Sequence, residues 1–341
     1  MNLTLERAVP PNRVRQLALS FPLSWRHRRP FQPPAQGSGL GAYYIRWWAG
    51  TGTFGEDWET KPRDCDGVLL TPGGDCYHPI GIAQYALHAH DRARAEGGEA
   101  IVRSFLAQAR WLRDHQQRRG GVCGCYPFAF PWHKYGAAAG WISAMAQGEA
   151  ISALLRAEAM QPGIGFIEAA VRAVEPFRRS ISEGGVVWRD RDGTFLEEVA
   201  VSSGAHILNG CIFALWGLYD LQRVAPQAWI DTLFDEVRET LERWLPQYDL
   251  GWWSTYSLFR TRDGRPHLAT LKYHAFHVSQ LRVLASMTGS KTFLETADRW
   301  EGYIDRTSCR LRVLSLMARN IAGRALLRDD GVAGGSGRAR A

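Results

Sequence analysis

The sequence has no long uninterrupted apolar run. Nowhere do about 18 apolar residues follow one another, which is the length that a membrane-spanning helix needs. The start of the chain, from Met1 to Arg7, also lacks the apolar stretch of a secretory signal. We therefore expect a cytoplasmic protein with no membrane span.

Signatures of metal and nucleic-acid binding are also scarce. Of the 6 cysteines, only Cys123 and Cys125 lie close together, and their spacing is not that of a redox or zinc motif. No helical pattern is striped with lysine and arginine, and no zinc-finger or RNP signature occurs. The net charge of +7 nevertheless suits an anionic ligand. We expect an acidic ligand that is not nucleic acid, and neither a metal nor a cofactor.

What the sequence does contain is a repeated pair of helical patterns. The pairs cover residues 79–96 with 99–118, 140–160 with 164–181, 202–224 with 226–245, and 273–288 with 290–305. The first pattern of each pair is apolar nearly all round, whereas the second has one charged face. A helix that is apolar on all sides is buried, so the repeat predicts an inner and an outer layer.

The predicted fold is therefore mainly all-α, an α/α-toroid or incomplete α/α-barrel of paired inner and outer helices. Strand-like alternation is limited to short stretches, so we expect β-hairpins only in the loops, near 185–188 and 252–258. Proline and glycine interrupt any periodicity before residue 43. We divide the chain into an extended arm (1–42), the toroid domain (43–328) and a flexible tail (329–341).

The long connections all precede inner helices. They cover residues 65–78, 121–139, 184–203 and 247–272. Because the inner helices of a toroid run in the same sense, these loops should converge at one end, beside helix N-termini whose partial positive charge favours an anion. The loops are rich in aromatic residues, which either plug the toroid or offer flat faces to a sugar ring. As a set confined to one end they predict a carbohydrate cleft.

Ionisable residues occur in the same loops. Glu197 and Glu198 are adjacent before the third inner helix, and a lysine, a tyrosine and two histidines open the fourth between residues 272 and 277. His274 and His277 lie three apart on one helix face, as a metal pair would, but no third ligand has a matching spacing. These residues alone do not distinguish an enzyme from a glycan-binding protein.

Four segments carry a family resemblance. They are residues 77–85 (YHPIGIAQY), 140–148 (GWISAMAQG), 208–221 (LNGCIFALWGLYDL) and 273–281 (YHAFHVSQL). Together with the Glu197-Glu198 pair and Tyr256 between them, these segments resemble the carboxy-terminal region of the D-glucuronyl C5-epimerases over about residues 75–305. Those enzymes convert glucuronate to iduronate in heparan-type polymers.

The resemblance implies an isomerase that transfers a proton at C5 of a uronic acid in an oligo- or polysaccharide. That proton lies α to a carboxylate, so the reaction needs a base on one face, an acid on the other and partial neutralisation of the carboxylate. By resemblance, Glu198, Tyr256 and Tyr273 hold catalytic positions. The candidate substrate-binding residues are Trp132, Trp141, Asn209, Arg260, Lys272, His274 and His277.

The chain also departs from the family pattern. Val199 and Phe213 replace tyrosines, and residues 270–271 replace an arginine and a tryptophan, which leaves Lys272 or Arg260 to neutralise the carboxylate. The expected conversion is that of D-glucuronate to L-iduronate, in a heparosan-like or other uronate glycan. A catalytically silent uronate-binding protein and a polysaccharide lyase stay open as alternatives, and so does a homodimer.

Overall fold

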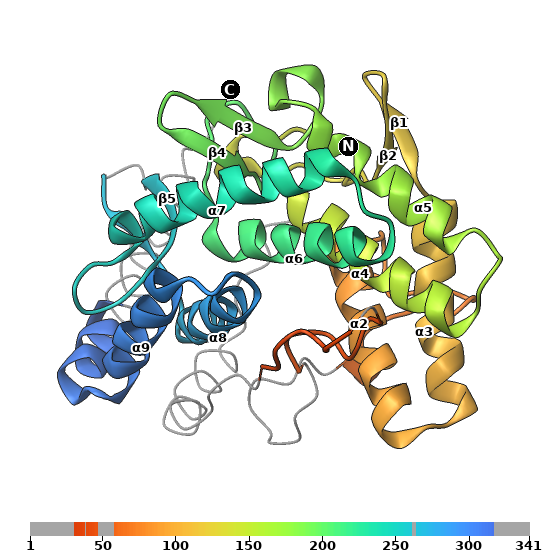
Figure 1. Ribbon diagram of the computed structural model, residues 1–341, viewed down its shortest axis with the longest axis horizontal. Coiled ribbons are helices and arrows are strands. Elements are labelled where there is room, and N and C mark those ends of the chain that lie inside the picture. Colours follow the sequence, from red (N-terminus) through yellow and green to blue (C-terminus); the bar gives the residue numbers. More distant parts are fainter. Residues whose placement is uncertain (1–30, 38, 47–57, 261–263, 317–341) are drawn as a thin grey trace, which may run out of the picture.

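The computed structural model describes residues 31–37, 39–46, 58–260 and 264–316 (Figure 1). Within these ranges α-helices dominate and strands form only short hairpins, which confirms the mainly helical fold class. None of the helices described there is long and apolar enough to cross a membrane. Residues 1–30 of the predicted arm and the whole predicted tail, 329–341, lie outside the described residues.

The helices follow one another in pairs. The pairs are α2 (Pro79–Glu96) with α3 (Glu99–Asp114), α4 (Ala144–Met160) with α5 (Phe166–Ala173), α6 (Leu208–Val224) with α7 (Ala228–Tyr248), and α8 (Leu271–Thr288) with α9 (Lys291–Asp305). The members of each pair pack together, and the first members touch in the order α2, α4, α6, α8. In Figure 1, α2 and α3 lie at one end of the molecule and α8 and α9 at the other.

Burial separates the two members of a pair, as the polarity pattern predicts. Every residue of α4 from Ala144 to Ala157 is buried, and α6 is buried from Leu208 to Leu218. In α7, by contrast, buried side chains recur at helical spacing, as at Leu233, Val237 and Leu241. The first helices therefore form the core, and the second ones cover it with one apolar face.

Capping residues and prolines set helix ends that the apolar pattern misplaced. Ser143 accepts a hydrogen bond from the backbone N–H of Ala146, so α4 begins at 144 and not at 140. Thr270 caps α8 in the same way through the N–H of Tyr273. The predicted helix 164–181 ends at 173, where a short 3₁₀ helix, η3 (Glu175–Arg178), carries Pro176 in its first turn.

Each connection into α4, α6 and α8 contains an antiparallel hairpin. The hairpins pair β1 (Gln117–Arg119) with β2 (Val122–Cys125), β3 (Val187–Asp190) with β4 (Gly193–Leu196), and β5 (Thr255–Arg260) with β6 (Pro266–Leu268). The second and third overlap the two predicted hairpins. The first was missed, because residues 117–118 continue the helical pattern of α3. Further 3₁₀ helices are η1 (Trp58–Thr60), η2 (His133–Tyr135) and η4 (Ile181–Glu183).

Helices α4 and α6 touch backbone to backbone. A Cβ atom added at Gly217 would lie 2.3 Å from the carbonyl oxygen of Gly148. Further along the same helices, Ser152 and Arg156 both contact Asp220. Gly148 of α4 contacts Gly217 of α6, and the later residues Ser152 and Arg156 contact the later residue Asp220. Helices α4 and α6 therefore run parallel.

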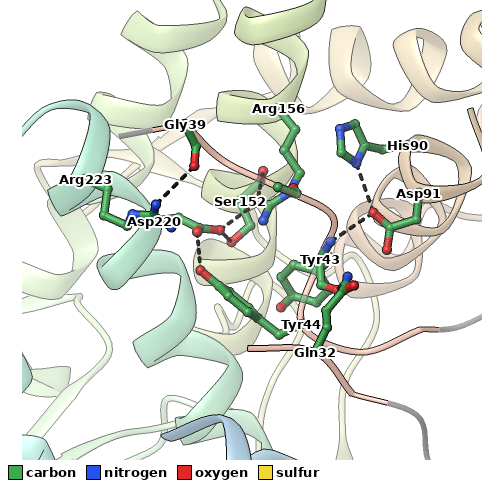
Figure 2. A network of polar contacts seen from close by, with 11 residues as sticks. Gln32, Gly39, Tyr43, Tyr44, His90, Asp91, Ser152, Arg156, Asp220 and Arg223 are labelled. Atoms are coloured by element: carbon green, nitrogen blue, oxygen red, sulfur yellow. Dashed lines mark hydrogen bonds and ion pairs between the residues drawn. The ribbon is translucent and has the colours of Figure 1, made fainter. Parts of the chain in front are cut away.

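A buried ion pair lies beyond this crossing (Figure 2). Nη1 of Arg156 is 2.6 Å from Oδ2 of Asp220, and both side chains are almost fully buried. Asp220 also accepts hydrogen bonds from the hydroxyls of Tyr44 and Ser152, at 2.5 and 2.7 Å, while Nε of Arg156 donates to the carbonyl of Gly41. Losing one partner of a buried pair costs about 3–5 kcal/mol. The pair thus anchors the amino-terminal segment to α4 and α6.

The same segment is fixed to α2. The backbone N–H of Tyr43 donates to Oδ1 of Asp91, which also lies 3.1 Å from Nδ1 of His90. The rings of Tyr43 and Tyr44 are both buried against Trp216 of α6. The boundary of the arm at residue 42 stays a prediction.

The Gly217→Ala variant should be less stable by about 1–3 kcal/mol, because its new Cβ meets backbone that cannot rotate away. Urea unfolding followed by circular dichroism measures this. The matched control is Gly302→Ala in α9, where an added Cβ meets nothing within 4 Å. Equal stability of the two variants would contradict the backbone contact between α4 and α6.

Candidate functional site

A cavity of about 490 Å³ lies where α2, α4, α6 and α8 begin. Side chains from their first turns line it: Ile80, Met145, Asn209, Lys272 and Tyr273. The connections that the sequence predicts to converge supply much of the remaining wall: His78, Trp132, Lys134, Tyr135, Glu198, Tyr256 and His267. The positive ends of several helix dipoles therefore surround one space.

Glu198 and Glu197 are adjacent but have different surroundings. Glu198, the second residue after β4, lines the cavity. Glu197 is completely buried and accepts hydrogen bonds from the backbone N–H groups of Ala205 and His206. Glu197 thereby fixes the turn that enters α6. Gly210 makes room for Glu198, because a Cβ at Gly210 would lie 2.3 Å from its Oε2.

The carboxyl group of Glu198 is buried beside a phenol and a lysine. Burial raises its pKa to about 8, while a hydrogen bond from the hydroxyl of Tyr256 and the charge of Lys134 oppose this rise. The hydroxyl of Tyr256 lies 3.4 Å from Oε1 of Glu198. Among the described residues, Oε2 has no hydrogen-bond partner. A carboxyl group with a pKa near neutrality can both accept and donate a proton.

Tyr256 connects Glu198 to Tyr273. The rings of Tyr256 and Tyr273 are 4.7 Å apart between centroids. Burial raises the pKa of Tyr256 above its ordinary value, and a hydrogen bond with Tyr273 contributes to the rise. Residues from the connection after β4, from β5 and from α8, distant in the sequence, thus form one continuous line of groups that carry exchangeable protons.

The charged side chains of the cavity are mostly cationic. Lys61, Lys134 and Lys272 line it, and Glu198 is the acidic residue among its described lining. His78 and His267 also line it, and burial lowers the pKa of each to about 4, so both are neutral at physiological pH. The cavity is therefore suited to an anion.

Two further polar groups face the cavity. Nδ1 of His78 accepts the backbone N–H of Gly81 at 3.1 Å, so the neutral ring carries its hydrogen on Nε2. Asn209 is buried, and its Oδ1 has no partner in the described part of the chain. Unpartnered buried oxygens such as this one and Oε2 of Glu198 call for an explanation, and a hydroxyl-bearing ligand supplies one.

Trp141 and Arg260, two of the predicted substrate-binding residues, are not part of the cavity wall. The ring of Trp141 stacks on Phe128 at 3.8 Å, and its Nε1 donates to the carbonyl of Phe130. Trp141 therefore packs behind the wall. Arg260 ends β5, where it is exposed and donates to the carbonyl of Gly264.

His274 and His277 also lie outside the wall. Both are completely buried, and Nδ1 of each contacts the hydroxyl of Ser254, at 2.8 and 3.0 Å. The ring of His274 stacks on Trp253, and its Nε2 contacts the carbonyl of Trp300. These contacts hold the hairpin of β5 against α8. In the described ranges no group of three or more histidine, cysteine or acidic residues is arranged for a metal ion.

Several cavity residues escaped the sequence analysis, namely Trp58, Lys61, His78, Lys134 and His267. Lys134 could have been identified from the sequence, since it lies two positions after Trp132 in an aromatic loop. His78 belongs to a segment that carried the family resemblance. No sequence signal joins His267 to Lys134, because the two are 133 positions apart and meet only in the fold.

A helical protein with such a cavity can hold an acidic ligand and exchange a proton with it. The model of the D-glucuronyl C5-epimerase C-terminus matches residues 122–302. The chain belongs to this family of D-glucuronyl C5-epimerase C-terminal domains.

Comparison with individual proteins gives the extent of the similarity. The chain is 33% identical to the D-glucuronyl C5-epimerase of Caenorhabditis elegans over 219 residues, which cover 59% of this chain and 35% of that protein. It is 25% identical over 179 residues to an uncharacterized protein of Methanocaldococcus jannaschii, covering 51% of this chain and 56% of that one. The chain thus spans less than two thirds of either relative. A crystal structure of D-mannose isomerase aligns with a TM-score of 0.41 and 9% identity, over 72% of this chain and 81% of that one.

Glu198 should titrate with a midpoint near pH 8 in the free protein. The pKa of Glu198 is higher in the folded chain than in the unfolded chain. Its contribution to the free energy of unfolding is therefore fully present at low pH, where the carboxyl group is neutral, and is lost as pH rises toward about 8. The Cδ resonance in ¹³C NMR measures the midpoint, with Glu198→Gln for assignment. That variant should also gain stability relative to the native chain between about pH 5 and 9. A midpoint near that of an ordinary glutamate would contradict the burial argument.

Proposed function

We propose that the chain is a uronate C5-epimerase that converts D-glucuronate to L-iduronate residues in a glycan. The observation that carries this proposal is the line of Glu198, Tyr256 and Tyr273 in a cavity whose other charged side chains are lysines. Removal of a proton α to a carboxylate needs a base and compensation of the growing negative charge. Membership of the D-glucuronyl C5-epimerase family supports the same reaction.

In the proposed reaction, Glu198 and Tyr273 act on opposite faces of the sugar ring. The carboxylate of Glu198 takes the C5 proton, and the electrons of the broken C–H bond move into the substrate carboxylate. Tyr273 then gives its hydroxyl proton to C5 from the other face, which inverts the configuration. Tyr256 contacts both groups, so a proton passed from Glu198 through Tyr256 to Tyr273 restores the starting state.

The protonation states support this division of tasks. A pKa near 8 leaves part of Glu198 ionised at neutral pH, as a base requires. A phenol is protonated at neutral pH and can therefore serve as the acid. In the reverse direction the two residues exchange roles. Acid, base and cationic side chains are together sufficient for this chemistry, so the proposed reaction uses no metal or cofactor.

The cavity also favours an acidic sugar over other anions. Its lysines and helix N-termini attract a carboxylate, and the rings of Trp132 and Tyr135 offer apolar surface to a pyranose. The unpartnered Oδ1 of Asn209 and Oε2 of Glu198 can accept hydrogen bonds from hydroxyl groups. We infer a uronic-acid-containing oligo- or polysaccharide, of which a heparosan-like chain is the first candidate.

We also infer that the helix pairs form an incomplete α/α-toroid. The contact of α2, α4, α6 and α8 in sequence order supports this arrangement, as does the parallel course of α4 and α6. The position of the cavity at the N-termini of these helices is a third support. In this arrangement residues 43–328 make up one domain.

One observation favours a second function, that of a glycan-binding protein without turnover. Val199 replaces a tyrosine of the family pattern, and its side chain is completely buried outside the cavity wall. A phenol that would have followed Glu198 is therefore missing. A polysaccharide lyase is the other alternative, since it takes the same proton and then expels the 4-linked sugar.

Incubation with a panel of uronic-acid glycans in deuterium oxide should place deuterium at C5 of both epimers, as read by NMR. Glu198→Gln should stop the exchange, and Tyr273→Phe should stop epimerisation without weakening binding, each by at least about a hundredfold. Glu295→Gln and Tyr219→Phe are matched controls, because both residues lie outside the cavity.

Other outcomes separate the alternatives. Binding without deuterium incorporation would identify a silent binding protein, and an unsaturated product that absorbs in the near ultraviolet would identify a lyase. If Glu198→Gln and Tyr273→Phe both kept native exchange rates, their assignment as acid and base would be wrong.

A further inference from the structure

Lys134 of η2 and His267 of β6 belong to different connections and meet at the cavity wall. Nζ of Lys134 lies 2.6 Å from Nε2 of His267, and Nδ1 of His267 lies 2.8 Å from the hydroxyl of Ser257. An ammonium group can only donate, so Nε2 accepts, and the hydrogen of the neutral ring is on Nδ1, facing Ser257. Burial and the charge of Lys134 lower the pKa of His267 to about 4, which keeps the ring neutral. His267 is therefore a fixed acceptor that orients a cation.

This cation lies beside the groups proposed to move the proton. The ring of His267 is 5.0 Å from that of Tyr256 between centroids, and the charge of Lys134 acts on the carboxyl group of Glu198. The other described lysines of the cavity have different neighbours. Lys61 lies 3.8 Å from the ring centre of Trp58, and Lys272 lies 5.9 Å from that of Phe276.

The chemistry of a uronate places its carboxylate close to the base. The carboxylate carbon is bonded to C5, the atom that loses its proton, so a cation that neutralises this carboxylate must also lie near the base. Arg260, one sequence candidate for this task, ends its strand outside the cavity wall. Lys134 meets the requirement because its partner His267 packs against Tyr256, whose hydroxyl contacts Glu198.

We infer that Lys134, oriented by His267, binds the carboxylate of the uronate ring at which the proton is exchanged. This inference rests on the proposed function. Negative charge on the carboxylate oxygens grows as the C5 proton leaves, so the cation stabilises the transition state more than the bound substrate. The same charge favours the ionised form of Glu198, the form that acts as base.

The test compares a tetrasaccharide of alternating glucuronate and N-acetylglucosamine with the same compound reduced from carboxylate to hydroxymethyl. Calorimetry should show that the native chain prefers the acidic form by about tenfold to a hundredfold, the range for a hydrogen bond to a charged group. Lys134→Gln should lose this preference and bind both forms alike. Lys134 is exposed, so its replacement should leave the melting temperature unchanged. The matched control is Lys291→Gln, an exposed lysine of α9, which should keep the preference.

Variants of His267 test its role as a positioning residue. His267→Ala removes the acceptor and should reduce the preference for the acidic tetrasaccharide by several fold. His267→Gln supplies an amide oxygen in its place and should restore part of it. A merely structural role would weaken the binding of both tetrasaccharides equally and leave their ratio unchanged.

Two failures can be told apart. If the native chain binds neither tetrasaccharide, or both alike, the proposed function fails and the inference fails with it. If the native chain prefers the acidic form and Lys134→Gln keeps that preference, the inference alone is overturned. Loss of the preference in Lys272→Gln instead would assign the carboxylate to Lys272.

Discussion

The direct backbone contact between α4 and α6 is the constraint on which the rest of the structure depends. Gly148 and Gly217 let the two helices approach until their backbones touch. On one side of this crossing, Arg156 and Asp220 come within ion-pair distance and anchor the amino-terminal segment. On the other side, the first turn of α6 leaves space beside Gly210 for Glu198. This close approach thereby positions both the buried ion pair of Arg156 and Asp220 and the cavity residue Glu198.

Features with a local cause were predictable from the sequence. The helix pairs follow from the spacing of apolar residues, and Glu198, Tyr256, Tyr273 and Asn209 line one cavity, as the order of loops and helices led us to expect. Features that depend on packing were not. Trp141 packs outside the cavity wall because its ring stacks on Phe128, and the sequence does not reveal this contact. The meeting of two residues 133 positions apart is equally invisible before folding.

The cavity combines groups that would be unfavourable if each were buried alone. Glu198 is buried at the cavity wall, yet Tyr256 donates to it and Lys134 offsets part of its charge. His78 and His267 stay neutral, so the lysines dominate the field. The site therefore favours an anionic ligand. Among the described residues, Oδ1 of Asn209 and Oε2 of Glu198 are buried without hydrogen-bond partners, so both can accept hydrogen bonds from a polar ligand.

The anchored amino-terminal segment also determines how a long ligand can approach. Tyr43 and Tyr44 fill the core among Asp91, Arg156 and Asp220, all located beyond the middle of their helices, while the cavity lies at the helix starts. Tyr43 and Tyr44 thus fill the core on the side of the helices away from the cavity. In the proposed function, a sugar residue would therefore enter and leave the cavity on the side of the helix starts.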